Sequence, residues 1–507
     1  MYRIRKVKTA SGKTAVQVVA YRRGQTLVIK HLGSAGSSSE MESLIRQGRV
    51  FIENDLGIVP LLPELSASSN SERQRQVLAG LRIYRKYHHL AYECFHDWYR
   101  RLNFDSLDNP LLRDLSFMRM VEPSSKLRAL KLLARYFGRS YSPRSLYRRL
   151  EVFPSLKDRV EKMAVVYAQK YLQFDFHLVF YDVTTLYFET FAEDDLRKCG
   201  YSKDGKANQP QILVGLLVSR EGFPIAYDLY PGQTFEGKTL IPLILSLKRR
   251  FHLKRLTVVA DAAMMSLDNL RKLKKERLNY IVGARVANLT QKKIRRISRF
   301  LKRKEGVYYR SRTDHGLLLC DYSKKRAAKD RADRQKQIRK AQKQMAGPKS
   351  EFRRSRFLKV SGQSTYSLNT ELIDKDKLLD GIKGYYTNLG LAAAGRSPSL
   401  IVARYHDLWQ VEKAFRLAKS DLLARPVFHH KEANIKAHLL IVFISLCLSK
   451  SLELYTGLSL KRIKDLVWEI EDIIFENEAG QEVATKRMDI KSEELLDLLK
   501  KIGLTTY

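Results

Sequence analysis

Three acidic residues stand in sequence settings that suit a shared metal site. Asp182 and Asp261 each close an apolar run with the composition of a β-strand. Glu412 lies within the segment 405–419, whose pattern predicts a single helix. Carboxylates at the ends of two strands and on a helix can converge on divalent cations, as phosphoryl transfer on nucleic acid requires.

Each carboxylate also has an ordinary structural interpretation. An aspartate after an apolar strand often serves as a turn or cap residue. The β-rich pattern continues past Asp182 through Phe188, however, so Asp182 is predicted inside a strand, where a charge is costly without a metal or partner. The same argument applies to Asp261, because Asp268 fits the start of the next helix better.

The predicted helix around Glu412 carries two further polar groups. Tyr405, Glu412 and Lys419 are spaced by seven residues, so they fall on nearly one line along a helix. Tyrosine and lysine at its ends are able to contact phosphate. Such a line is common on amphipathic surface helices, so by itself it is weak evidence of function.

The charge of the chain points to nucleic acid. The 507 residues include 93 Lys and Arg against 54 Asp and Glu, which gives a net charge of 93 − 54 = +39 and a pI near 10.0. This balance is typical of proteins that follow a phosphate backbone, although a ribosome-associated factor has it too. The length predicts two to four domains, and 44% hydrophobic residues are enough to fold them.

The pattern divides the chain into six segments. They are a β-hairpin region at 1–57, a basic helical region at 71–165, a first core part at 174–321, a basic insertion at 322–374, a second core part at 375–450 and a helical region at 451–507. In the first segment, the hairpin turn is predicted at Gly24 and a Gly/Ser-rich joint at 33–39.

The region 71–165 contains a candidate DNA-reading element. A helix over 124–135 is followed by a stop at Gly138, and Ser142 with the proline after it predicts the capped start of a second helix. The second helix carries three arginines. Helix, short turn and basic helix are compatible with a helix-turn-helix motif, but such pairs are common in any helical domain. The arginines are Arg144, Arg148 and Arg149.

Strand-like runs at 177–183, 211–218, 224–230 and 256–261 introduce the core, and a capped helix at 267–276 with a strand at 280–284 completes a strand–helix–strand unit. In the insertion, a charged helix over 324–340, with a stop predicted at Gly347 and Pro348, suits a solvated surface as well as DNA contact. The apolar run 439–448 is shorter than the roughly 18 residues that span a bilayer, so it predicts a core helix and no membrane partner. The four cysteines are scattered and predict free thiols of a reducing compartment.

The sequence resembles DDE-type transposases of bacterial insertion sequences over roughly residues 110–450. The group has the signature Tyr-x2-Arg-x3-Glu-x6-Lys, and Tyr405, Glu412 and Lys419 fill three of its positions. Leu408 stands at the arginine position, and Arg404 or Arg416 is a candidate to substitute for that arginine, although neither has the family spacing. The matching stretches are 181–189, 200–206, 258–261, 380–388, 405–419 and 425–429.

The resemblance implies an α/β protein with a ribonuclease-H-like catalytic core and mixed sheet, an insertion between the second and third acidic residues, and a mainly helical N-terminal region preceded by a β-hairpin. It implies two Mg²⁺ ions, with Mn²⁺ as a substitute. Asp182 would bridge both ions, and Asp261 and Glu412 would each hold one. Tyr405, Lys419 and Arg416 would contact DNA.

The implied activity is cleavage at the ends of the element and strand transfer into target DNA. The implied partners are double-stranded DNA and a second copy of the chain on that DNA, in the bacterial cytoplasm and its nucleoid. An inactive DNA-binding relative, a structure-specific nuclease and a non-enzymatic binder fit the same residues. His429, His430 and His438 lack companion cysteines for zinc, so phosphate contact or core packing is expected of them.

Overall fold

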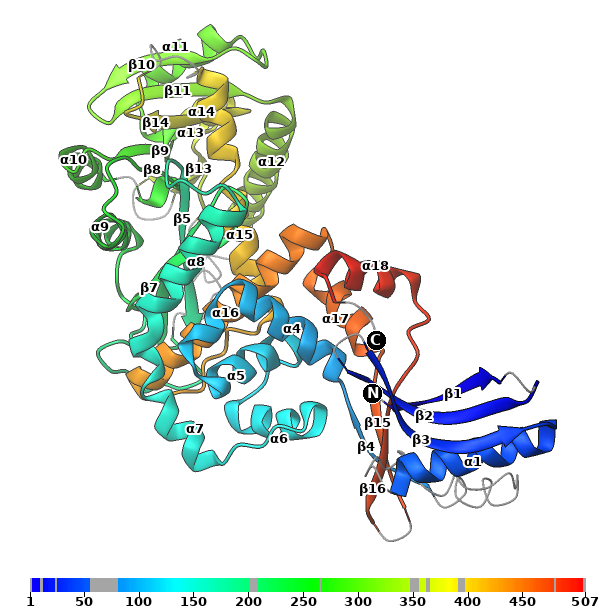
Figure 1. The fold of residues 1–507 in the computed structure, drawn as a ribbon. Helices are drawn as coiled ribbons and strands as arrows, with labels where there is room; N and C mark the ends of the chain where they lie inside the picture. The colour runs from blue at the N-terminus through cyan, green and yellow to red at the C-terminus, as the bar shows by residue number, and fades with distance from the viewer. Residues whose placement is uncertain are drawn as a thin grey trace. The chain divides into compact units, whose positions relative to one another are not determined.

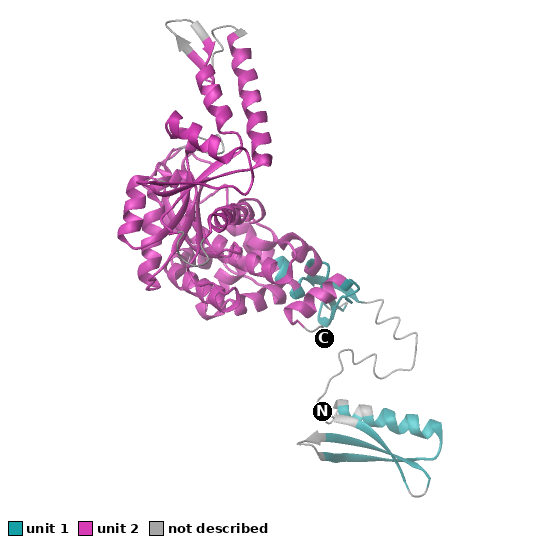
Figure 2. Ribbon diagram, turned by 90° about the horizontal axis from the view of Figure 1, so that it is seen from above, with its two compact units in different colours: residues 1–90, 135–137, 468–493 teal, residues 91–134, 138–467, 494–507 magenta. Residues whose placement is uncertain are grey.

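The computed structural model describes most of the chain as two compact units (Figure 2). Unit 1 comprises 1–90, 135–137 and 468–493, and unit 2 comprises the rest. The hairpin turn at Gly24, most of the motif 200–206 and the end of the charged helix at 347–348 lie outside the described residues. The described residues are 2–9, 12–22, 25–54, 81–200, 208–264, 266–346, 355–361, 365–390, 397–477 and 480–504.

Unit 1 begins with an antiparallel three-stranded sheet and one helix. The predicted hairpin is confirmed, since β2 and β3 pair from Thr14↔Ala35 to Arg22↔Gln25. The predicted joint at 33–39 is wrong, because β3 keeps pairing through Ala35 and the helix starts at Ser38. The elements are β1 (Tyr2–Lys8), β2 (Thr14–Arg22), β3 (Gln25–Ala35) and α1 (Ser38–Asn54).

A second antiparallel sheet of unit 1 joins distant parts of the sequence, in the order β16-β15-β4. Asp472 fastens it by accepting hydrogen bonds from Arg487 Nε at 2.7 Å and pairing with His89 Nδ1 at 2.8 Å. Helix was predicted at these positions, and that prediction is wrong because the strands pair with partners far away in the sequence. They are β4 (Arg82–Tyr87), β15 (Asp472–Glu476) and β16 (Glu482–Arg487).

Helices precede the main sheet, as the pattern predicted. The side chain of Ser142 accepts a hydrogen bond from the backbone N–H of Ser145, so the predicted cap is confirmed, and Ser125 caps the preceding helix in the same way through Arg128. The helices are α4 (His89–Arg101), α5 (Pro110–Val121), α6 (Lys126–Phe137), α7 (Pro143–Leu150) and α8 (Lys157–Tyr171), with short 3₁₀ turns at η1 (Phe104–Leu107) and η2 (Phe153–Leu156).

Unit 2 is built on an eight-stranded mixed sheet with the order β10-β11-β14-β9-β8-β5-β6-β7 (Figure 1). Within this sheet, β5, β6 and β7 are antiparallel neighbours in chain order. On the other side of β5, β8 pairs parallel with β5, and β9 pairs parallel with β8. The order β7-β6-β5-β8-β9 is the strand order of a ribonuclease-H-like core, so the predicted fold class is confirmed. The five strands are β5 (Val179–Tyr187), β6 (Gln211–Val218), β7 (Pro224–Pro231), β8 (Thr257–Ala260) and β9 (Asn279–Ala284).

Helices cover both faces of this sheet, with α9 and α10 on one side and α14 and α15 on the other (Figure 1). Ser266 caps α10 through the N–H of Asn269, as predicted. The covering helices are α9 (Leu240–Arg250), α10 (Leu267–Lys275), α14 (Pro398–His406) and α15 (Trp409–Arg416), with 3₁₀ turns at η3 (Glu236–Lys238), η4 (Ala262–Met264) and η5 (Val286–Asn288).

The predicted apolar core helix is α16 (Glu432–Thr456), which packs against α5 and β7. By length and composition it could cross a membrane, but 94% of its most apolar window is buried within the described protein. That burial is what a core helix requires. The chain then continues through α17 (Leu460–Trp468) and α18 (Glu493–Ile502).

The insertion predicted at 322–374 follows β10 and β11 of the main sheet, and the sheet resumes after it with β14 beside β9. Its long charged helix α12 is anchored: Arg334 is 8% exposed and donates to both carboxylate oxygens of Asp380. The elements are α11 (Gln291–Leu301), β10 (Tyr309–Thr313), β11 (Gly316–Tyr322), α12 (Lys324–Ala346), β12 (Leu358–Ser361), β13 (Thr365–Leu368), α13 (Thr370–Leu378) and β14 (Ile382–Thr387).

Candidate active site

Two of the acidic residues are brought together by strand pairing. β5 and β8 run parallel, and their last paired residues are Tyr181 and Ala260. Asp182 and Asp261 each follow directly, so they are neighbours at the edge where β8 ends. β5 continues beyond this point alongside β6, which places Asp182 inside a strand as predicted. Asp182 is half-buried and Asp261 is exposed.

Tyr405 joins Asp261 through the end of α14. Its hydroxyl donates a hydrogen bond to Asp261 Oδ1 at 3.2 Å, and its side chain is only 4% exposed. Burial raises the pKa of Tyr405, and the negative charge of Asp261 raises it further. The hydroxyl therefore stays protonated and acts as a donor that orients the carboxylate.

A glycine makes this approach sterically possible. A Cβ atom added to Gly283 on β9 would lie 2.6 Å from the Tyr405 hydroxyl and 3.0 Å from the backbone nitrogen of Ala262. Both contacts are shorter than van der Waals distance, and Ala262 directly follows Asp261. Gly283 thus leaves the space that the Tyr405–Asp261 contact occupies.

The single helix predicted over 405–419 is wrong. α14 ends at His406, α15 begins at Trp409, and a π-helical turn, η7 (Leu417–Asp421), follows. At the break, the backbone N–H groups bond three residues back instead of four, as in Leu408 to Tyr405. The side chain of Leu408, which lies at this break, is only 7% exposed.

The break changes how the third carboxylate is positioned. Tyr405, Glu412 and Lys419 do not share one straight helix, so their seven-residue spacing does not align them. Glu412 instead sits on α15, which packs against β5 and β6. This packing sets an exposed Glu412 on a helix beside the strand that holds Asp182.

Lys383 is a site residue that sequence reasoning missed. Its ammonium lies 4.5 Å from the ring centroid of Tyr405, and the side chain is half-buried. Burial lowers the pKa of Lys383, while the negative charges of Asp261 and Glu412 act in the opposite direction. Lys383 is the only charged residue of β14, and that isolation in an apolar strand is the sequence signal that identifies it.

Asp261 lines a cleft of about 550 Å³, whereas Asp182 and Glu412 are not among its lining residues. Asp261, Tyr405 and Lys383 line one wall, and α12 of the insertion contributes Arg326 and Arg334. The charged helix therefore faces the candidate site and does not only cover a solvated surface. Sequence reasoning left these two alternatives open, and it missed Arg326 as a lining residue.

The described residues contain no group of three or more His, Cys, Asp or Glu side chains close enough to hold a metal ion. Strand pairing makes Asp182 and Asp261 neighbours, but with Glu412 they do not form a closed set of ligands. The donor chemistry fits, because carboxylate oxygens are the ligands that Mg²⁺ and Mn²⁺ prefer. Asp261 and Glu412 are exposed, so neither side chain is fixed by burial.

The predicted DNA contacts are spread over two regions. Lys419 is half-buried in η7, beside residues of β5 that lie beyond Asp182, and Arg416 is exposed at the end of α15. All three arginines of α7 are exposed, and none of them lines the cleft. They are Arg144, Arg148 and Arg149.

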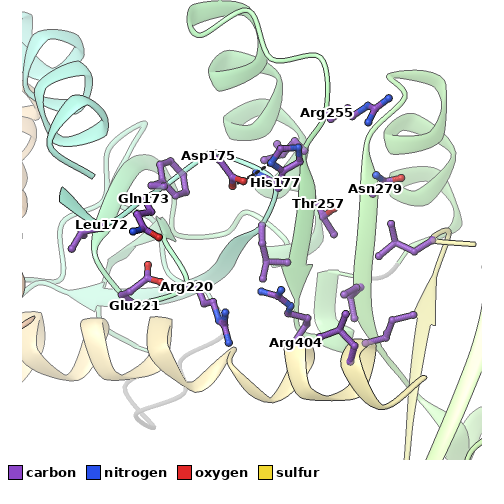
Figure 3. Close-up of a pocket in the computed structure, with 17 residues that line it drawn as sticks. Leu172, Gln173, Asp175, His177, Arg220, Glu221, Arg255, Thr257, Asn279 and Arg404 are labelled. Atoms are coloured by element: carbon purple, nitrogen blue, oxygen red, sulfur yellow. Dashed lines mark hydrogen bonds and ion pairs between the residues drawn. The ribbon is translucent and has the colours of Figure 1, made fainter. Parts of the chain in front are cut away.

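Arg404 lies in a different cavity, of about 540 Å³, together with Arg220 and Arg255 (Figure 3). This cavity includes Thr257 and Asn279, the first residues of β8 and β9. Asp182 and Asp261 lie where β8 ends, so Arg404 is at the opposite end of these strands, near where β8 and β9 begin. It does not take the place of the family arginine.

A ribonuclease-H-like core with one acidic residue on its first strand and another directly after its fourth strand defines the class of this protein. A family model described as "Transposase DDE domain" matches residues 177–448, which is more than half of the chain. The chain belongs to this family. The resemblance to DDE transposases is thereby confirmed, without the narrower insertion-sequence group.

The chain is also similar to a solved structure described as a cryo-EM structure of piggyBac transposase synaptic complex with hairpin DNA. The identity is 10% and the TM-score 0.36, over 75% of this chain and 70% of that chain. Among curated proteins there is no significant match.

Gly283→Ala tests the packing around Asp261. We expect strand cleavage to fall at least tenfold while the melting temperature changes little, because the added methyl group displaces the Tyr405 hydroxyl and Ala262. The control is Gly390→Ala, whose added Cβ meets no atom within 4 Å. Cleavage assays and thermal melting of both variants make the comparison. Full activity of Gly283→Ala would refute the positioning role.

Proposed function

We propose that the protein is a DNA transposase that binds the ends of its element and catalyses metal-dependent DNA cleavage and strand transfer. The observation that carries this proposal is the pairing of β5 with β8, which sets Asp182 beside Asp261. The family match and the net charge of +39 support a DNA substrate. The narrower assignment to an insertion-sequence group belongs to the same proposal.

Asp182, Asp261 and Glu412 are the residues that would hold Mg²⁺. When bound, Mg²⁺ supplies Lewis acidity at the phosphate and a more acidic water, and both cleavage and strand transfer need these. The chain itself supplies orientation and charge. Tyr405 fixes the Asp261 carboxylate by a hydrogen bond, and Lys383 holds a positive charge near Asp261 and Glu412.

DNA would be held by groups outside the carboxylates. Lys419 and Arg416 would contact the backbone near the cleaved bond, since phosphate contacts set the position of a strand. The exposed arginines of α7 would contribute to reading the end sequence. Two ends must be joined in one reaction, so we propose that two copies of the chain act together on DNA.

A nuclease that cuts without joining is the second candidate. The buried Leu408 favours it, because a buried leucine at the arginine position of the signature makes no contact with DNA. Strand transfer separates the two functions: a transposase yields joined products from cut ends, and a nuclease yields cut ends alone.

The variants Asp182→Asn, Asp261→Asn and Glu412→Gln test the catalytic carboxylates. We expect each to abolish cleavage of labelled candidate ends in Mg²⁺ and to leave DNA affinity within about threefold, because each removes a ligand charge and little volume. Asp268→Asn, on the exposed first turn of α10, is the matched control and should cut normally. A variant that still cuts is not part of the site, and cutting in excess EDTA would contradict metal dependence.

Lys419→Ala tests the backbone contact. We expect weaker binding of end DNA and a salt dependence flatter by about one phosphate, because one cation no longer releases counterions. Lys272→Ala serves as control, since Lys272 is exposed on α10 at the other face of the sheet. Fluorescence anisotropy across a salt series gives both slopes. Equal slopes for wild type and Lys419→Ala would exclude the contact.

A further inference from the structure

The N-terminal sheet of unit 1 has one face that is covered by α1 (Figure 2). On this face, the ammonium of Lys30 on β3 lies 4.0 Å from the ring centroid of Phe51 on α1. A Cβ atom added to Gly48 of α1 would lie 3.2 Å from the side chain of Ile4 on β1. Val18 of β2 is paired with both Ile4 and Lys30, so this row of side chains faces the helix.

The opposite face of the sheet carries a row of three polar side chains. Gln17 of β2 is paired with Arg5 of β1 on one side and with His31 of β3 on the other. Successive residues of a strand point to opposite faces, and directly paired residues of antiparallel strands point to the same face. Arg5, Gln17 and His31 therefore project together from the face that α1 leaves open.

These three side chains are accessible to a partner. Arg5 and His31 are exposed, and Gln17 on the central strand is half-buried. None of the three side chains makes a hydrogen bond or an ion pair with another described residue. A guanidinium, an amide and an imidazole together offer both donors and acceptors of hydrogen bonds. The row can therefore recognise a pattern of polar groups and not only a charge.

Charge is segregated between the sheet and its helix. The strands β1, β2 and β3 contain arginine and lysine but no aspartate or glutamate. The acidic residues of the first 54 positions all belong to α1, and they are Glu40, Glu42 and Glu53. The open face is thus part of a layer with positive charge alone, which is complementary to a polyanion.

Among polyanions, double-stranded DNA fits the dimensions and the chemistry of the row. Arg5 and His31 are two strand spacings apart, which is roughly 10 Å, and the major groove of DNA is about 12 Å wide. In that groove, arginine pairs with the edge of guanine and glutamine with the edge of adenine. The major groove of double-stranded RNA is too deep and narrow for side chains to read.

We propose that the open face of the N-terminal sheet binds in the major groove of the element's end DNA, where Arg5, Gln17 and His31 contact base edges. The proposal rests on the proposed function and deepens it, because it names a surface that reads the end sequence in addition to α7. Phosphate contacts position a protein without distinguishing sequences, so discrimination between sequences is the property that this face supplies.

Binding of two duplexes tests this reading role. Fluorescence anisotropy measures the affinity of full-length protein for an end duplex and for a duplex of the same composition in scrambled order. The Asp182→Asn background keeps the result independent of cleavage. We expect Arg5→Ala and Gln17→Ala each to reduce the preference for the end about tenfold, because a contact with a base edge is lost. Gln17→Ala removes no charge, so its salt dependence should equal that of wild type.

The matched controls are Arg46→Ala and Gln47→Ala, which make the same changes at exposed positions of α1 and should keep the full preference. A preference that survives in both Arg5→Ala and Gln17→Ala would overturn the inference and leave the proposed function standing. A protein without any preference for the end before these changes would contradict the proposed function itself. Dimers of the DNA-free protein that Arg5→Ala dissociates would assign the face to a second copy and overturn the DNA assignment.

Methylation of guanine N7 locates the contact, because this atom lies in the major groove. End duplexes methylated at single guanines are bound to the same Asp182→Asn protein with and without Arg5→Ala. We expect at least one guanine whose methylation weakens binding when Arg5 is present and has no further effect in Arg5→Ala, where the contact is already absent. Identical patterns of interference in the two proteins would show that Arg5 does not contact a guanine edge and would overturn the proposal.

Discussion

The parallel pairing of β5 with β8 is the constraint on which the candidate site depends. Tyr181 and Ala260 are paired, and the next residue of each segment is an acidic one. A slip of one residue in this register would turn one carboxylate to the other face of the sheet. The neighbouring strand β9 preserves the arrangement, because Gly283 lets Tyr405 reach Asp261. The relative position of the two candidate aspartates therefore depends on backbone hydrogen bonds between strands.

Local signals in the sequence predicted the elements that hold this register. Alternating and continuous apolar runs predicted β5 to β9, and a serine cap predicted α10, because these features are determined by neighbouring residues. Elements fixed by distant partners were not predictable in the same way. β4 pairs with β15, almost 400 residues later in the chain, and the break after His406 brings the buried Leu408 into a tight turn.

The site shows the same division between local and tertiary information. Asp182, Asp261 and Glu412 were selected because an acidic residue is unusual in an apolar context or matches a family spacing. Lys383 was missed although it is the only charge in β14, and Arg326 is a single member of a set of 93 basic residues. Only folding shows that these two residues line the same cleft as Asp261.

The central claim is that three carboxylates, distant in sequence, act as one cation site. Titration of the full-length protein with Mn²⁺, followed by electron paramagnetic resonance in the presence of DNA, tests it most directly. The account predicts saturable binding in wild type and a loss of at least tenfold in affinity when any one of Asp182, Asp261 and Glu412 is made neutral. Binding that is equally tight in all three variants would contradict it.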